Sequence, residues 1–305
     1  MLLNAPQIVQ YQGSKRLLAP KILEYFPKTI NTLFEPFSGM AALTIAAAQQ
    51  KRASAYHLND LNAPLVMILQ SAIETPELLI DEYSKIWNEQ FVFSEGSIQH
   101  FYKVRDEFNS GDKSAAKLLY LIARCVKGSV RYGSNGKFNQ SPDKRRNGTK
   151  PSTLQPRLYE ISALLKDKTA FTALDYREIF EMAKEGDLIY MDPPYQGVSN
   201  VRDNRYFSGV SLEKFAESLE VLNKRNVDFV ISYDGICGDK TYGKDLPSDL
   251  GCKKVLLNAG YSSQSTLLGR KEITKEALYI SRNLVKENSF SPSIVQPELE
   301  FGFAV

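Results

Sequence analysis

The residues best suited to chemistry form the tetrapeptide Asp192-Pro193-Pro194-Tyr195, which follows the apolar run Leu188–Met191. In an open α/β sheet, ligands bind beyond the carboxyl ends of the strands. Because proline has no N–H group, this backbone offers carbonyl acceptors and few donors. Asp192 adds a carboxylate and Tyr195 a flat ring, so the cluster suits a ring amino group that donates two N–H bonds. A strand-ending turn is the alternative interpretation, since Asp and Pro are common in turns.

The positive charge of the chain is concentrated in one segment. Residues 124–157 carry nine basic side chains and one acidic side chain, a net charge of +8, whereas the whole chain carries +3. Tyr132, Phe138 and several glycines interrupt the segment, which favours a hairpin or extended loop. Its cations could hold DNA phosphates while its amide and planar groups reach base edges. A solvated surface loop is the alternative.

The elements that must position these residues follow from the apolar pattern. Helical periodicity predicts helices over Lys15–Phe26, Met40–Gln50, Pro64–Ser71 and Leu212–Asn223, the last one capped by Ser211. Short runs of β-branched, aromatic and aliphatic residues predict seven strands: Thr32–Phe37, Ser54–Leu58, Ala170–Leu174, Leu188–Met191, Asp228–Ser232, Lys253–Leu257 and Ala277–Ser281. Strands that alternate with helices predict a Rossmann-like α/β fold, whose mostly parallel sheet has helices on both faces.

The spacing of the strands predicts an insertion. About 110 residues separate the second strand from the third. We therefore expect a core domain over residues 1–62 and 169–286, and an inserted, mainly helical domain over residues 63–168 that carries the basic hairpin. Residues 287–305 form a C-terminal tail for which the sequence predicts no structure.

The composition excludes several classes of protein. With 43% hydrophobic and 24% charged residues, the chain is typical of globular proteins. No apolar run approaches the roughly 20 residues of a membrane span, and the first residues lack the pattern of a secretory signal. Three cysteines without a C-x-x-C spacing and only two histidines argue against a disulfide framework and a metal site. We expect a cytoplasmic protein with no metal centre.

Several short motifs follow one another along the chain in a fixed order: Tyr11–Lys15, Phe34–Gly39, Asn59-Asp60, Leu174–Tyr176 and Asp192–Tyr195. Their order resembles the Dam-like family of S-adenosylmethionine-dependent N6-adenine DNA methyltransferases. The resemblance spans about residues 8 to 283, and Lys127–Asn139, within the basic segment, is similar to the family's DNA-contacting hairpin. It implies that the insertion over residues 63–168 is the DNA target-recognition domain. Ala41 departs from the family pattern, which commonly has a glycine there.

The resemblance implies methyl transfer from S-adenosylmethionine to the N6 amine of an adenine flipped out of duplex DNA. The Asp192 carboxylate and the Pro193 carbonyl would accept the two N–H bonds of that amine, in a corner stiffened by Pro194. Tyr195 would stack on the base. Asp60 would bind the ribose hydroxyls of the cofactor, although an acid at this position could instead cap a helix. The implied cofactor-binding residues are Tyr11, Lys15, Glu35, Pro36, Phe37, Gly39, Asp60, Asp175, Tyr176 and Asp192.

For DNA, the resemblance assigns a base-edge contact to Arg131, which could bind a guanine in a bidentate manner, through two of its guanidinium nitrogens. The remaining DNA-binding candidates are Lys127, Lys137, Asn139, Lys144, Arg145, Arg146, Arg270 and Lys271. The partner would be double-stranded DNA, and the enzyme would be a monomer. It would belong to a restriction-modification system, whose cognate endonuclease would act separately.

Three other functions compete with this one. N4-cytosine methylation uses similar geometry, but those enzymes more often carry Ser at the position of Asp192. Methylation of an RNA base or of a protein glutamine amide favours Asn at that position. A DNA-binding module that has lost catalysis is the third, and the intact cofactor motifs argue against it.

Overall fold

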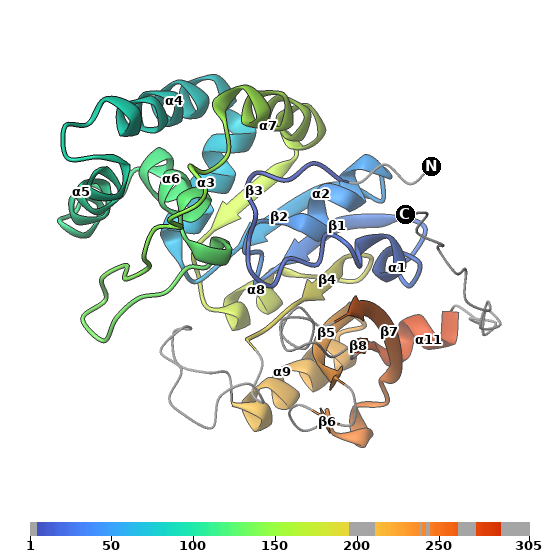
Figure 1. The fold of residues 1–305 in the computed structure, drawn as a ribbon. Helices are drawn as coiled ribbons and strands as arrows, with labels where there is room; N and C mark the ends of the chain where they lie inside the picture. Colours follow the sequence, from blue (N-terminus) through green and yellow to red (C-terminus); the bar gives the residue numbers. More distant parts are fainter. Residues whose placement is uncertain (1–4, 195–210, 238–239, 242–244, 262–272, 288–305) are drawn as a thin grey trace, which may run out of the picture.

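A computed structural model describes residues 5–194, 211–237, 240–241, 245–261 and 273–287 (Figure 1). One sheet runs through it in the order β3-β2-β1-β4-β5-β8-β7, and the short β6 pairs with β5. The predicted seven-stranded sheet is confirmed, and the two-residue β6 is an addition. The strands are β1 Ile30–Glu35, β2 Ala53–Asn59, β3 Thr169–Thr172, β4 Leu188–Met191, β5 Asp228–Cys237, β6 Lys240–Thr241, β7 Lys253–Tyr261 and β8 Ile273–Ile280.

Five neighbouring strands of the sheet are parallel, from β3 through β2, β1 and β4 to β5. In contrast, β8 is antiparallel to both β5 and β7. The register pairs Glu35 with Leu58, and Met191 with Ile231. Because parallel strands end at the same edge, the segments that follow β1, β2, β3 and β4 meet there.

Both faces of the sheet are covered, as predicted. Along β4, Leu188 and Tyr190 join one apolar cluster while Ile189 and Met191 join another, so successive side chains point to opposite faces. The second cluster is closed by α8 Tyr176–Met182 and α9 Leu212–Lys224. Ser211 caps α9 by accepting the Lys214 N–H, as expected. The first cluster is closed by α1 Ala19–Leu23, α2 Ala42–Gln49 and the helices of the insertion.

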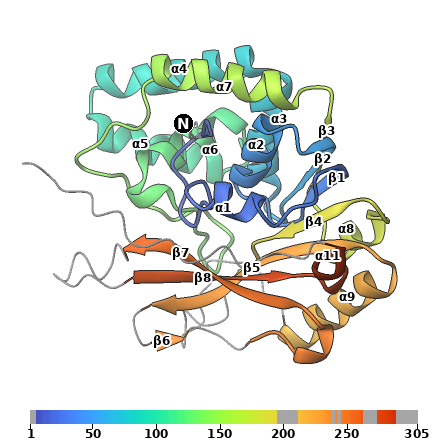
Figure 2. The ribbon, with the colours of Figure 1, turned by 90° about the vertical axis from the view of Figure 1, so that its right-hand side faces the viewer.

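The insertion between β2 and β3 is mainly helical. Figure 2 shows α4 and α7 lying over α3 and α6, on the side of the sheet away from α8 and α9. Phe101, Leu118 and Ile161 belong to the same apolar cluster as Leu33 of β1, so insertion and sheet share one core. Its helices are α3 Ala63–Glu74, α4 Pro76–Val92, α5 Ser97–Asn109, α6 Ala115–Arg124, the 3-10 turn η1 Val126–Gly128 and α7 Pro151–Leu165.

Two short elements complete the described fold, the 3-10 turn η2 Ser248–Leu250 and the helix α11 Arg282–Glu287. In the described part of the chain, no single helix is long and apolar enough to cross a membrane. The helices α3 and α4 reach that length and composition only together, and they are bent by 119° at their junction.

Candidate active site and DNA-facing segment

A cavity of about 420 Å³ lies where the parallel strands end. This volume is within the range of small-molecule sites. Segments that follow β1, β2, β3 and β4 form its walls, together with residues 11–15 near the N-terminus. All ten residues assigned to the cofactor from the sequence line this one cavity: Tyr11, Lys15, Glu35, Pro36, Phe37, Gly39, Asp60, Asp175, Tyr176 and Asp192.

The expected catalytic corner opens into the same cavity. Asp192, Pro193 and Pro194 follow β4 directly and line it, whereas Tyr195 lies outside the described residues. The Asp192 carboxylate is 2.9 Å from the Lys15 ammonium, which also lies 2.9 Å from the Glu276 carboxylate. Burial lowers the pKa of Lys15, but the two carboxylates outweigh it and the pKa is raised. Lys15 is therefore a charged lysine held between two acids.

Glu35, the last residue of β1, carries a proton at neutral pH. One oxygen of its carboxyl group accepts the Thr44 hydroxyl at 2.6 Å and the Thr44 N–H at 3.3 Å. Burial raises the pKa of Glu35 to about 8, against these bonds, and the charges of Asp192 and Asp60 add to the rise. A neutral Glu35 can thus lie close to the two carboxylates that face the cavity.

Asp60 is fixed by two backbone N–H groups. Its side-chain oxygens accept bonds from Gly39 at 3.0 Å and from Asn62 at 2.9 Å. Burial raises the pKa of Asp60, and these two bonds oppose the shift. The alternative expected for Asp60 was a helix cap. The N-cap residue of α3 is instead Asn62, two residues later.

The turn between β1 and α2 depends on left-handed backbone. Gly39 has φ +49°, and a Cβ there would lie 3.1 Å from the Tyr11 ring. Ala41, where the family pattern has a glycine, adopts φ +52° as the N-cap residue of α2. The turn therefore packs closely against Tyr11, which brings the N-terminal segment to the cavity.

Asp175 has a structural role as well as a place at the cavity. It caps α8 by accepting the Arg177 N–H, forms a capping box with Glu178, and pairs with the Arg177 guanidinium at 2.8 Å. The neighbouring Tyr176 ring packs on the Phe37 ring at 5.6 Å between centroids, and both rings line the cavity. They offer a flat apolar surface beside the polar groups.

Asn59 fixes two walls of the cavity, a role that its sequence motif did not predict. Its fully buried amide donates to the carbonyls of Pro36 at 2.9 Å and Leu174 at 3.0 Å. It accepts the Thr172 hydroxyl and the Leu174 N–H, both at 2.8 Å. All four hydrogen-bonding positions of the amide are used. An asparagine at the end of a buried strand is the sequence signal that could have identified it.

A hairpin is present between α6 and α7, in the segment for which the sequence predicts one (green in Figure 1). Gly133 donates to the Lys137 carbonyl at 2.8 Å, and Asn139 donates to the Arg131 carbonyl at 3.0 Å. Lys137 and Asn139 are exposed, as is Lys127, whose φ of +62° is left-handed. Arg131 is half-buried, and its Nε has no hydrogen-bond partner among the described residues.

The cations that follow the hairpin differ in their surroundings. Lys144, Arg145 and Arg146 are exposed, and Arg146 pairs with Asp143 at 2.7 Å. Arg124, which the sequence count included in the basic segment, is 2% exposed and bonds to Gln90, so it is not part of the basic surface. The candidates Arg270 and Lys271 lie outside the described residues.

Comparison with known proteins identifies the family. A model of the D12 class N6 adenine-specific DNA methyltransferases matches residues 11–259. The chain belongs to this family. The match confirms the resemblance drawn from the motifs, and it covers the cavity loops, the hairpin and the Asp192 corner of this D12-class methyltransferase.

Curated relatives support the assignment over different lengths. The type II methyltransferase M1.LlaDCHI of Lactococcus lactis subsp. cremoris is 29% identical over 63% of this chain and 66% of its own. The type II methyltransferase M.MjaIII of Methanocaldococcus jannaschii is 25% identical over 81% and 94%. The DNA adenine methylase of Escherichia coli strain K12 is 27% identical over 73% and 79%. The chain thus spans about two thirds of the first relative and nearly all of the second.

Side chains from the helices of this D12-class chain bind the backbone of residues 143–149, within the basic segment. Buried side chains donate to three of its carbonyls: Tyr83 to Thr149 at 2.6 Å, Gln90 to Asn147 at 3.3 Å, and Arg124 to Asp143. The three bonds fix the course of residues 143–149.

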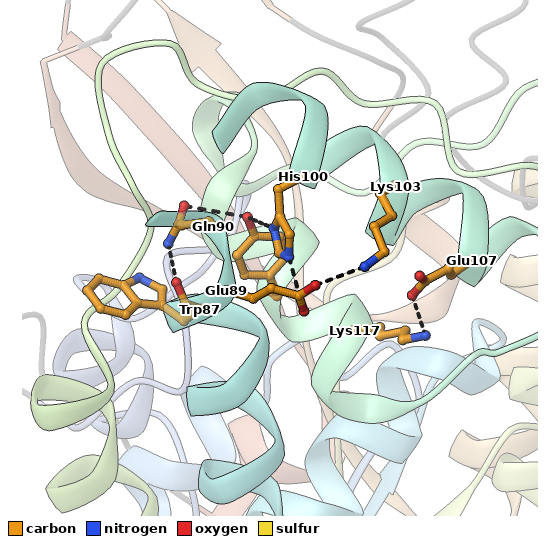
Figure 3. Close-up of polar contacts among 8 residues, drawn as sticks. Trp87, Glu89, Gln90, His100, Lys103, Glu107 and Lys117 are labelled. Atoms are coloured by element: carbon orange, nitrogen blue, oxygen red, sulfur yellow. Dashed lines mark hydrogen bonds and ion pairs between the residues drawn. The ribbon is translucent and has the colours of Figure 1, made fainter. Parts of the chain in front are cut away.

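Gln90 also belongs to a polar network inside the helices (Figure 3). It donates to the Trp87 carbonyl at 2.8 Å and accepts the Tyr120 hydroxyl at 3.5 Å, and that hydroxyl lies 3.1 Å from His100. Glu89 joins His100 to Lys103. Across the described ranges, no group of three or more His, Cys, Asp or Glu side chains could hold a metal ion.

Proposed function

We propose that this D12-class chain uses S-adenosylmethionine to methylate the N6 amine of an adenine flipped out of duplex DNA. The observation that carries the proposal is the single cavity, in which the Asp192 corner faces the residues expected to bind the cofactor. A methyl donor and an amine acceptor could therefore meet in one cavity.

The side chains of the cavity fit an adenosyl cofactor. Asp60 is held as a hydrogen-bond acceptor for ribose hydroxyls, and the Phe37 and Tyr176 rings offer a surface for a purine. When bound, S-adenosylmethionine supplies an activated methyl group on its sulfonium centre.

The protein groups would act on the target amine. The N6 lone pair of adenine is delocalised into the ring, which makes the nitrogen a weak nucleophile. The Asp192 carboxylate and the Pro193 carbonyl would accept its two N–H bonds and favour a pyramidal nitrogen. Lys15, held by Glu276, would orient the Asp192 carboxylate, which takes the proton that the amine loses. Fixed orientation of this kind corresponds to effective molarities of about 10⁵–10⁸ M.

The insertion would deliver the DNA to this site. We assign residues 63–168 to target recognition, and residues 1–62 and 169–286 to catalysis. We assign a base-edge contact to Arg131, a half-buried residue of the hairpin, and phosphate contacts to Lys144 and Arg145, which are exposed. Relatives named type II methyltransferases support a place in a restriction-modification system, with an endonuclease that acts separately.

The test uses duplex DNA and cofactor labelled in its methyl group, followed by digestion to nucleosides. We expect the label in N6-methyladenine. Asp192→Ala should lower the rate of transfer by roughly a hundred- to a thousandfold, since it removes an acceptor aimed at the reacting group. Asp249→Ala, at an exposed acid of η2, is the matched control and should keep the wild-type rate.

Two outcomes would overturn the proposal. Label in N4-methylcytosine would reassign the target base. Full activity of Asp192→Ala would remove the Asp192 corner from the mechanism.

A further inference from the structure

The DNA-facing hairpin also forms part of the wall of the cofactor cavity. Val130 and Tyr132 line the cavity together with Asp60 and Asn62. The Tyr132 hydroxyl donates to the side-chain oxygen of Asn62 at 3.1 Å, and the two residues are 70 positions apart in the sequence. The hairpin is therefore in contact with the segment that follows β2.

A short series of hydrogen bonds continues from this contact to the turn after β1. The backbone N–H of Asn62 donates to one oxygen of Asp60 at 2.9 Å, and the Gly39 N–H donates to the other at 3.0 Å. Two bonds thus connect the Tyr132 hydroxyl to the carboxylate expected to bind the ribose.

The other end of this series is anchored in the hairpin. Tyr132 lies opposite Phe138, with ring centroids 6.2 Å apart. Phe138 is 1% exposed, and its backbone exchanges two hydrogen bonds with the Asn109 side chain, at 2.8 and 3.0 Å. Arg131 precedes Tyr132 directly, so the docking of Tyr132 constrains the backbone at the proposed base-reading residue.

We propose that Tyr132 is a positioning residue that couples cofactor binding to DNA binding. A cofactor in the cavity contacts the hairpin wall only when Tyr132 is docked on Asn62, so it favours the docked state. A ligand shifts an equilibrium by its difference in affinity for the two states. The docked hairpin holds Arg131 in place for DNA, and DNA must tighten the cofactor by the same factor. This inference rests on the proposed function.

The experiment measures DNA affinity with and without a cofactor that cannot react. The full-length chain is titrated into a fluorescent duplex that the wild type methylates, alone and with saturating S-adenosylhomocysteine. Couplings of this kind are typically about 5- to 150-fold. We expect S-adenosylhomocysteine to lower the wild-type Kd for DNA by at least about fivefold, and by less than about twofold in Tyr132→Phe, which keeps the ring and loses only the hydroxyl.

Three further variants separate coupling from stability. Asn62→Ala removes the acceptor and should lose the same cofactor effect, and the double variant of Tyr132→Phe with Asn62→Ala should lose no more than either single one. Tyr56→Phe is the control, since the Tyr56 hydroxyl bonds the Ala53 carbonyl in the same strand, and it should keep the wild-type ratio.

An undiminished ratio in Tyr132→Phe would overturn the inference. So would a wild type that methylates DNA but binds it equally with and without S-adenosylhomocysteine. A wild type that neither binds nor methylates duplex DNA would instead overturn the proposed function.

Discussion

Glu35 shows how one buried side chain sets the charge of the cavity. Glu35 is 4% exposed, and burial raises its pKa, with smaller contributions from the charges of Asp192 and Asp60. With Glu35 ionised, three carboxylates would surround a space expected to receive a nucleoside. Protonation of Glu35 removes one of these charges and keeps its bond to Thr44.

The proton on Glu35 predicts a pH-dependent stability. Because the pKa rises from 4.5 to about 8 on folding, the folded protein keeps a proton that the unfolded chain releases. This contribution to stability is complete below about pH 4.5 and is lost as the pH rises to about 8. The free energy of unfolding of the wild type, relative to Glu35→Gln, should therefore fall across this window. Denaturant unfolding at a series of pH values measures it.

Glu185→Gln is the control, because Glu185 is exposed, and its curve should follow the wild type. A constant difference between the wild type and Glu35→Gln from pH 4.5 to 8 would show that Glu35 is ionised throughout.

At the scale of single residues, the motifs located the cavity but not all of its supports. Asp60 and Asp192 stand in recognisable blocks, so the sequence predicted that they share one site. Asn59 stands in the same block as Asp60, yet its role depends on Thr172 and Leu174, more than 100 residues away. The protonation of Glu35 depends on burial, which the sequence does not express locally.

At the scale of elements, the backbone at the end of α2 adopts an unfavourable left-handed conformation at Lys51. Lys51 has φ +53°, and the N–H groups of Lys51 and Arg52 bond the carbonyls of Ala48 and Ala47. This is the Schellman arrangement, in which glycine most often occupies the position of Lys51. Lys51→Gly should raise the free energy of unfolding by about 1 kcal/mol, because a left-handed backbone is unfavourable for residues with a Cβ. Denaturant unfolding measures the change.

Lys51→Ala is the matched control, since it removes the charge and keeps the Cβ. It should leave the free energy of unfolding close to that of the wild type. Equal effects of the two variants would show that the lysine side chain, and not the backbone, is responsible.

The boundaries of helices and strands were predicted best where nearby residues in the sequence terminate the element. Leu188–Met191 is a strand as predicted, because Asp192 and two prolines stop it. The predicted helix Lys15–Phe26 is reduced to Ala19–Leu23. Pro20 stands in its first turn, where its missing N–H is tolerated, and Lys15 points to Asp192 instead. Strand β5 runs on to Cys237 through its pairing with β8, which is remote in sequence.

At the scale of the whole molecule, the surface charge predicts how salt affects DNA binding. Each phosphate contact contributes about one unit to the slope of log K against log salt. Replacing Lys144, Arg145 and Arg146 with glutamine should weaken binding to all duplex sequences and reduce the slope by about two to three units. The effect of Arg146 should be the smallest, because it already pairs with Asp143. Titrations at several salt concentrations give the slope.

A charge-matched control tests whether position matters as well as net charge. Lys28, Lys166 and Lys184 are exposed and precede β1, β3 and β4, at the amino ends of the strands. Replacing these three with glutamine should leave the slope unchanged. The same loss of slope in both triple variants would mean that net charge alone governs binding.

Residues 143–149 are anchored through their carbonyl groups, and this affects how the basic surface formed by Lys144, Arg145 and Arg146 can evolve. Donors from Tyr83, Gln90 and Arg124 bind main-chain oxygens, which every amino acid provides. Outward side chains can therefore be exchanged without losing these anchors. We expect relatives with different target sites to share one main-chain course here while differing in what they display. Specificity could then diversify by point substitution, without insertions or a rebuilt scaffold.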